Sequence, residues 1–164
     1  METITKKNTV IDKFISEFES LKKSLFGNLT IREQAIEAFT KQGIPNRKNE
    51  EYKYLNVDLI LKGEFAFTNV QTPSKAQIEH AEFLKDTIVA VVENGAFVET
   101  FSKTQNLPKG LAICSLAKAS IDQKQIFDKH YSRYADVNAD AFIALNTALA
   151  NDGVFIHIAK GAVI

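Results

Sequence analysis

The sequence has 164 residues, of which 45% are apolar and 24% are charged, as in an ordinary globular protein. Lysine plus arginine equals aspartate plus glutamate at 20 each, and this balance argues against a protein that binds polyanions through a large basic excess. A single cysteine excludes an internal disulfide and fits a reducing compartment. Because no signal peptide and no apolar run of ~20 residues is found, we expect a cytoplasmic location.

The first part of the chain predicts two helices. Between residues 10 and 26, large apolar side chains recur every three or four positions, and Gly27 ends this pattern. Thr30 and Glu33 have the spacing of a capping box at the start of a second helix, which Gly43 ends. The side chains expected on its buried face are Ile31, Ala35, Ile36 and Phe39.

The segments that follow are less regular. Residues 43–56 are polar with interleaved tyrosines and predict an ordered loop. Residues 57–73 have no clean period and predict an irregular segment. Ser74 and Gln77 fit another capping box, which begins a short helix that reaches about Lys85.

The period then changes to that of strands. Residues 88–92 and 96–101 are rich in β-formers, and Glu93, Asn94 and Gly95 join them. Asn-Gly between two such runs predicts a hairpin with a type I′ turn, which needs a positive φ at both positions. The remaining expected elements are a strand around Leu111–Cys114, helices over residues 120–130 and 138–150, and a strand over residues 154–158.

These elements predict an α+β fold with N-terminal helices, a small antiparallel sheet that contains the hairpin, and further helices. We expect residues 1–150 to form one N-terminal domain. The sequence ends in apolar residues, Gly161–Ile164, where a natural terminus is usually solvated. This ending favours a fragment of a longer protein, cut inside a strand-rich region.

Neither the cysteine nor the histidines suggest a catalytic or metal site. Cys114 lies in a β-like run, and free cysteine is among the most buried residue types, so we favour a core position over a nucleophile. His80, His130 and His157 are too scattered for a local metal motif. We expect His157 to point away from its apolar neighbours. The sequence therefore predicts no catalytic, cofactor-binding or metal-binding residue.

The loop over residues 43–56 contains two weaker candidates. Glu50 and Glu51 are adjacent carboxylates, but an acid–base pair needs surroundings that separate two pKa values, so we expect a solvated face. The loop also contains side chains of the kinds that contact single-stranded nucleic acid, namely Arg47, Lys48, Tyr52, Lys53 and Tyr54. The two glutamates among them offset the positive charge. No Gly-rich phosphate loop is present.

Three stretches of the sequence resemble the SufD branch of the SufB/SufD family. Residues 43–54, GIPNRKNEEYKY, resemble its segment G-[IL]-P-x-x-K-x-E-x-[WY]-[KR]-[YF]. Residues 142–153 resemble the segment F-x-A-L-N-x-A-x-x-x-D-G, and residues 89–115 resemble a V-N-G-x-F hairpin followed by L-P-x-G-[VL]. Tyr52 stands where tryptophan is frequent, and Leu55 stands where threonine is common. SufB differs in the first segment.

The resemblance implies the N-terminal domain of a SufD-like subunit of the SUF iron–sulfur cluster assembly complex, acting through protein–protein contact. SufB and the ATPase SufC would be its partners. Residues 151–164 would begin a right-handed parallel β-helix and be truncated there, which leaves the strand over residues 154–158 ragged or paired with a neighbouring molecule. The cysteine and histidine implicated in cluster building, and most SufC contacts, belong to a part that this sequence lacks.

The resemblance therefore implies no enzymatic activity and no cofactor for these residues. Two other hypotheses remain open. One is a nucleic-acid-binding module that uses the strip from Arg47 to Tyr54. The other is a small enzyme that depends on Cys114.

Overall fold

The computed structural model describes residues 2–62 and 87–164, and it describes side chains from Val10 onward. The described residues form two compact units, each built from two separate stretches of sequence. The first unit contains residues 2–62 and 130–150, and the second contains residues 87–129 and 151–164. Helices make up the first unit, and the second combines short helices with two small antiparallel sheets, so the expected α+β class is confirmed.

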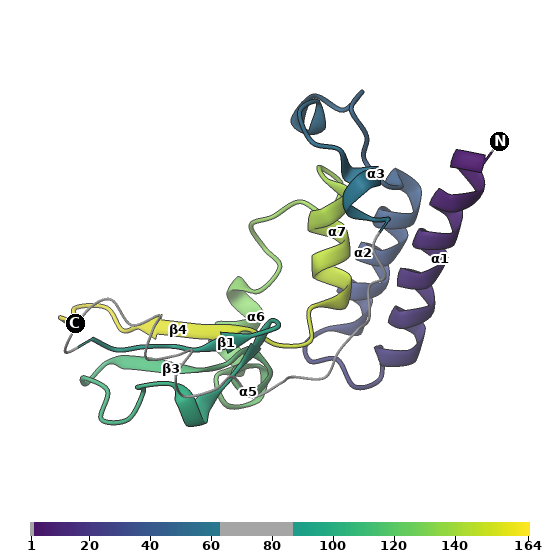
Figure 1. The fold of residues 1–164 in the computed structure, drawn as a ribbon. Coiled ribbons are helices and arrows are strands. Elements are labelled where there is room, and N and C mark those ends of the chain that lie inside the picture. Colours follow the sequence, from purple (N-terminus) through teal and green to yellow (C-terminus); the bar gives the residue numbers. More distant parts are fainter. Residues whose placement is uncertain (1, 63–86) are drawn as a thin grey trace. The chain divides into compact units, whose positions relative to one another are not determined.

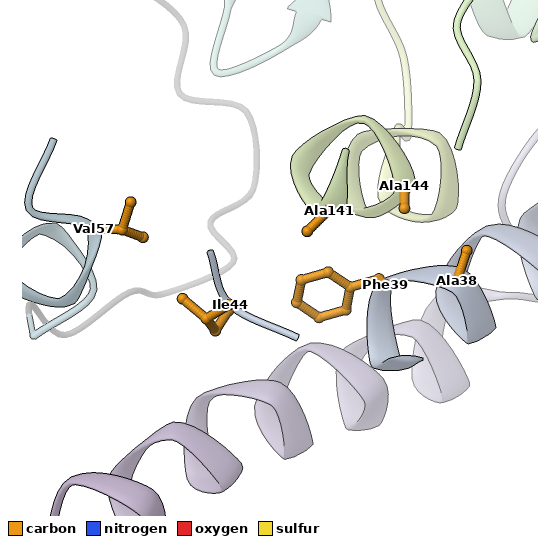
Figure 2. Packing of buried hydrophobic residues seen from close by; sticks show 6 residues of the cluster. All are labelled: Ala38, Phe39, Ile44, Val57, Ala141 and Ala144. Carbon is orange, nitrogen blue, oxygen red and sulfur yellow. The ribbon is translucent and has the colours of Figure 1, made fainter. Parts of the chain in front are cut away.

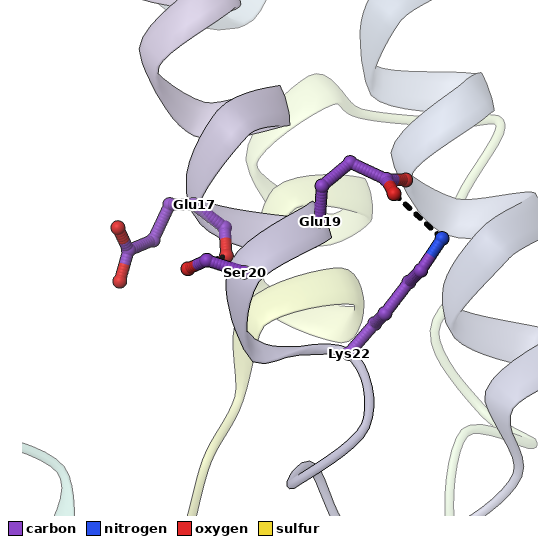
Figure 3. Close-up of polar contacts among 4 residues, drawn as sticks. All are labelled: Glu17, Glu19, Ser20 and Lys22. Atoms are coloured by element: carbon purple, nitrogen blue, oxygen red, sulfur yellow. Dashed lines mark hydrogen bonds and ion pairs between the residues drawn. The ribbon is translucent and has the colours of Figure 1, made fainter.

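The first helix, α1 (Glu2–Leu21), is longer at its start and shorter at its end than the sequence predicted. The apolar period runs from Val10 onward, and side chains in this part of the helix, such as Phe14 and Phe18, pack on the core. The helix stops before Gly27 because the Ser24 hydroxyl and backbone N–H both donate to the Leu21 carbonyl, at 2.8 Å each. Near this end, Lys22 pairs with Glu19 at 2.6 Å, and the Ser20 hydroxyl donates to the Glu17 carbonyl (Figure 3).

The second helix, α2 (Leu29–Gln42), begins with a different cap from the expected one. The side chain of Asn28 accepts a hydrogen bond from the Thr30 N–H at 2.9 Å, so the capping box that starts at Thr30 is wrong. Asparagine is among the preferred capping residues, and its position two residues earlier places Thr30 inside the first turn. Gly43 ends the helix with a φ of 69°, as expected.

The polar loop after Gly43 is ordered and contains a short 3-10 helix, η1 (Glu50–Tyr52). A one-turn helix, α3 (Val57–Ile60), follows, so the prediction of an irregular segment from residue 57 is wrong over these four residues. The side chain of Asn56 caps α3, and one turn is too short to show a period. Leu61 and Lys62 form a turn, whereas residues 63–73 and the helix expected at residues 74–85 lie outside the described residues.

The core of the first unit forms where α7 (Ala141–Leu149) packs beside α2 (Figure 1). Alanines on the facing sides of both helices allow the close approach, and Phe39 fills the space between them with none of its surface exposed. Figure 2 shows this cluster, which consists of Ala38, Phe39, Ile44, Val57, Ala141 and Ala144. On α2, the expected Ala35 and Phe39 are buried, whereas Ile31 and Ile36 are half-buried.

The second unit contains the expected hairpin. Strands β1 (Val92–Glu93) and β2 (Ala96–Phe97) pair antiparallel, with Glu93 opposite Ala96. Asn94 and Gly95 have φ values of 47° and 85°, which confirms the turn with two positive φ angles. Both strands are shorter than expected, and a 3-10 helix, η2 (Glu99–Phe101), takes up the last part of the second predicted strand.

The second sheet joins β3 (Leu111–Ser115) to β4 (Val154–Ile158) in antiparallel pairing, from Leu111 opposite Ile158 to Ser115 opposite Val154. The expectation that β4 is ragged is therefore wrong, whereas its pairing with a neighbouring molecule stays a prediction. A strand of equal length within the same unit satisfies its backbone groups along one edge.

Two helices, α5 (Leu116–Asp122) and α6 (Lys124–His130), replace the single helix expected over residues 120–130. The Ser115 hydroxyl accepts a hydrogen bond from the Lys118 N–H at 3.0 Å, so α5 begins directly after β3. None of the described helices has the length and apolar character needed to cross a membrane.

Candidate functional site

The loop over residues 43–56 is joined to α7 through a tyrosine and an aspartate that lie 88 positions apart. The Tyr52 hydroxyl donates to Asp140 Oδ2 at 2.5 Å, and the Tyr52 ring lies 5.9 Å from the ring of Phe142. Asp140 Oδ1 caps α7 by accepting from the N–H groups of Phe142 and Ile143, at 2.8 and 3.1 Å. Two of the three segments that carry the resemblance, residues 43–54 and 142–153, therefore contact each other through Tyr52 and Phe142.

Burial and hydrogen bonding shift the pKa values of both Tyr52 and Asp140. Burial, followed by the hydrogen bond to Asp140, raises the pKa of Tyr52 to about 12. Burial raises the pKa of Asp140, but the hydrogen bonds from Tyr52 and from two backbone N–H groups outweigh it, so the net pKa is lowered. At neutral pH a phenol thus donates to a carboxylate, and the pair links two elements without a group ready to exchange protons.

The loop side chains at residues 47–51 and 53–56 are exposed. Glu50 and Glu51 are both exposed, and Glu50 forms an ion pair with Lys53, so the solvated face expected for these glutamates is confirmed. The ammonium of Lys53 lies 5.1 Å from the centre of the Tyr54 ring. Tyr54 itself is 92% exposed. The five side chains of the predicted strip therefore do not act together, because Tyr52 faces Asp140 and Lys53 is paired.

Asp152 and Gly153, in the second of these segments, connect several parts of the second unit. Asp152 Oδ2 accepts from the Phe97 N–H at 3.0 Å, and Oδ1 accepts from the Ala117 N–H at 3.2 Å. The Gly153 carbonyl accepts from the Leu116 N–H, and a Cβ at Gly153 would lie 2.6 Å from Leu116 Cδ1. The sequence predicted only a break at these residues, because nothing in local spacing indicates which distant N–H groups a carboxylate will meet.

Arg32 is a buried cation that sequence analysis missed. It is 1% exposed and lies on α2, and burial lowers its pKa. Its Nη1 donates to the carbonyls of Thr147 and Ala148 at 3.3 and 3.0 Å, and its Nε donates to the Phe26 carbonyl at 2.9 Å. The guanidinium also lies 4.8 Å from the centre of the Phe26 ring. Because the last carbonyls of a helix carry partial negative charge, Arg32 fixes α2 to the C-terminal end of α7.

Cys114 and His157 lie on the same face of the β3–β4 sheet. Cys114 pairs with Phe155, and the ring of His157 stacks on Phe155 with a centroid distance of 6.4 Å. Burial is the largest influence on Cys114 and raises its pKa, so the thiol stays protonated at neutral pH and is a weak nucleophile. The face opposite His157 carries Ile156 and Ile158, which are 55% and 53% exposed.

The expected orientation of His157 is confirmed relative to Ile156 and Ile158, which lie on the opposite face of β4. The histidine is half-buried, however, and it shares its face with Phe155. In a strand that alternates polar and apolar residues, the polar side chain usually faces solvent. Here the imidazole of His157 stacks on the ring of Phe155, and this contact favours the less exposed face. His130 is exposed and contacts the Tyr134 hydroxyl, and His80 lies outside the described residues. In residues 2–62 and 87–164, no three His, Cys, Asp or Glu side chains cluster as metal ligands.

A protein-family model matches the sequence over nearly the whole chain. The matching family model is described as the SufBD protein N-terminal region, and it covers residues 5–164. The match includes the loop after α2, the hairpin and the α7–β4 segment. It connects the chain with iron–sulfur cluster assembly. The chain belongs to the SufB/SufD family, as its N-terminal region.

Proposed function

We propose that these residues form the N-terminal domain of a SufD-type subunit of the SUF complex, and that they act by protein–protein contact. The observation that carries this proposal is the family match over residues 5–164. The loop at residues 43–54 supports the SufD branch over SufB, because it carries the motif in which the two branches differ. In this proposal, residues 151–164 lead into a right-handed parallel β-helix.

The buried and half-buried polar side chains support a contact role rather than catalysis, because they form structural hydrogen bonds. Tyr52, Asp140 and Asp152 each bond to a second element of their own unit, and Arg32 does the same through backbone carbonyls. The raised pKa of Cys114 disfavours an enzyme that uses this thiol. We therefore propose no enzymatic activity and no catalytic, cofactor or metal residue in this domain, and we propose a cytoplasmic location.

The partners in this proposal are SufB and the ATPase SufC, and we place most SufC contacts outside these 164 residues. Titration calorimetry of the chain against purified SufC tests this placement. We expect no heat of binding and no change in ATP hydrolysis. Micromolar binding would show that the N-terminal domain itself carries a SufC site.

A chimera tests the function. The chain replaces the N-terminal region of SufD in a bacterium that depends on its SUF complex and lacks its own SufD, and a matched chimera is made with SufB. We expect the SufD chimera, but not the SufB chimera, to restore growth and the activity of iron–sulfur enzymes. Rescue by the SufB chimera alone would assign the chain to the SufB branch. Failure of both, with both chimeras folded and present at normal levels, would contradict the proposed function.

A further inference from the structure

The segment between Ile44 and Lys62 has a backbone that is fixed at several points. Ile44 and Val57 are buried in the core, at 7% and 2% exposure, and Tyr52 bonds to Asp140 between them. Within the segment, Asn46, Asn49 and Asn56 accept backbone hydrogen bonds with their side chains, at distances of 2.9 to 3.2 Å. Such asparagine-capped turns restrict the backbone locally.

This fixed backbone nevertheless exposes four large apolar side chains within seven consecutive residues. Tyr54 is 92% exposed, Leu55 44%, Leu59 62% and Ile60 53%. The core of the first unit uses Ile44 and Val57 from the same segment, so folding does not require the other four to be apolar. Exposed apolar side chains that are grouped and rimmed by polar residues mark interaction surfaces. Because the backbone is already ordered, this segment would lose little conformational entropy when a partner binds here.

The exposed charged side chains of this segment that lack an ion-pair partner are mostly positive. Arg47, Lys48 and Lys62 are exposed, and none of them forms an ion pair with another described residue. Lys53 and Glu50 form an ion pair, so their charges offset each other. Asp58 is half-buried and already has an interaction partner, so it is not counted as unpaired. Glu51 is the remaining exposed carboxylate of the segment. The segment therefore has three unpaired cations and one unpaired anion.

We propose that this surface, defined by Tyr54, Leu55, Leu59 and Ile60 with the cations Arg47, Lys48 and Lys62, binds an acidic amphipathic helix of a protein partner. The apolar stripe of such a helix covers the four apolar side chains, and carboxylates beside the stripe meet the three cations. Three of the four apolar side chains are aliphatic and offer no ring for a base to stack on, which favours a protein over nucleic acid. The inference rests on the proposed contact function and adds the chemistry of the partner.

The test uses the chain labelled with ¹⁵N and a designed fluorescent helix of about five turns, with leucines in one stripe and glutamates beside it. The matched control peptide carries lysine at each glutamate position. We expect chemical-shift changes confined to residues 47–62, and binding of the acidic peptide at least about tenfold tighter than that of the lysine peptide. Equal binding of both peptides, or shift changes elsewhere on the chain, would overturn the proposal.

Variants locate the surface. We expect Leu59→Ser with Ile60→Ser, and separately Arg47→Glu with Lys48→Glu, each to weaken acidic-peptide binding by about tenfold or more. Ile121→Ser is the matched control, because Ile121 is 77% exposed on α5, and it should leave binding unchanged. Circular dichroism confirms that each variant is folded.

Two further outcomes would also overturn the proposal. Tighter binding of a single-stranded oligonucleotide than of the acidic peptide would assign the surface to nucleic acid. Concentration-dependent dimerisation that shifts the same resonances would assign it to a second copy of the chain. The peptide assay needs no cluster assembly, so its failure beside a working SufD chimera would refute this surface alone, and peptide binding beside a failed chimera would refute the SufD function alone.

Discussion

The two units differ in what stabilises them. Among the described residues, nine of the twelve buried apolar side chains belong to the first unit, and only Ala96, Ala119 and Phe127 belong to the second. The second unit instead depends on the β3–β4 ladder, on the hairpin turn and on the carboxylate of Asp152. A core of packed apolar side chains leaves a period in the sequence, whereas a network of backbone hydrogen bonds does not.

The largest expected effect concerns the core of the first unit. Phe39→Ala removes a fully buried ring that contacts Phe14 edge-on at 5.8 Å, and we expect a loss of about 4 kcal/mol in the free energy of unfolding. Urea denaturation measures the loss, and hydrogen exchange shows where it occurs. We expect faster exchange in α2 and α7 and unchanged exchange in β3 and β4. An equal increase in both units would show that their stabilities are not separate.

The next effect tests the buried cation of the first unit. Arg32→Met keeps most of the side-chain length but leaves the carbonyls of Phe26, Thr147 and Ala148 without their donor. We expect the free energy of unfolding to fall by about 3 kcal/mol. This figure already includes the gain from no longer burying a charge. Thermal unfolding measures it. A variant as stable as the original would mean that apolar packing alone fixes α2 to α7.

The hairpin of the second unit gives a smaller effect. Gly95→Val places a β-branched residue at a φ of 85°, and we expect a loss on the order of 1–3 kcal/mol. No neighbouring atom lies within 4 Å of the added Cβ, so the loss reports backbone strain rather than a clash. Chemical denaturation measures it. An unchanged midpoint would mean that this turn adds nothing to the stability of the second unit.

The carboxylate of Asp152 tests whether single polar groups fix the second unit. Asp152→Asn retains one oxygen but turns an amide donor toward either the Phe97 or the Ala117 N–H, and we expect a loss of about 1.5 kcal/mol. Hydrogen exchange at these two N–H groups should rise in the variant. Exposed Asp122→Asn on α5 is the control. Equal exchange in the variant and the original would contradict the role of Asp152.

Local sequence patterns predict the structure correctly where neighbouring residues decide it. The Asn94-Gly95 turn and the end of α2 at Gly43 depend on neighbouring residues, and both are present. The expected strand at residues 154–158 is also present, although it pairs with the distant strand β3. The cap of α2 was misplaced because Asn28 and Thr30 are both good capping residues, and only the backbone geometry separates them. The end of α1 was also misplaced, because the hydrogen bonds from Ser24 to the Leu21 carbonyl end the helix before Gly27.

Contacts between distant residues could not be predicted in this way. Arg32 sits on an otherwise apolar helix face and is recognisable only once the carbonyl end of α7 lies beside it. The Tyr52–Asp140 bond spans 88 positions, and the partners of Asp152 lie 55 and 35 positions away. The family resemblance identified the segments that contain Tyr52 and Asp152, but the sequence alone could not show which distant residues they contact.

The smallest effect concerns the Tyr52–Asp140 bond of the first unit. Tyr52→Phe keeps the ring against Phe142 and removes the hydroxyl, so we expect a loss of about 1 kcal/mol at neutral pH. Because folding raises the pKa of Tyr52 from about 10 to about 12, its contribution is complete below pH 10 and is lost as pH rises toward 12. Folding lowers the pKa of Asp140, so the contribution of this carboxylate is present above about pH 4 and is lost as pH falls below that value.

The stability difference between the original chain and Tyr52→Phe should therefore be constant near neutral pH and shrink at both extremes. Urea denaturation at a series of pH values measures this difference, and phenolate absorbance should show that the variant lacks a group that titrates near pH 12. Tyr54→Phe is the matched control, because Tyr54 is 92% exposed, and its stability should follow the original chain at every pH. A difference for Tyr52→Phe that stays constant to pH 12 would mean that the hydroxyl does not bond to Asp140, and that ring packing alone joins the loop to α7.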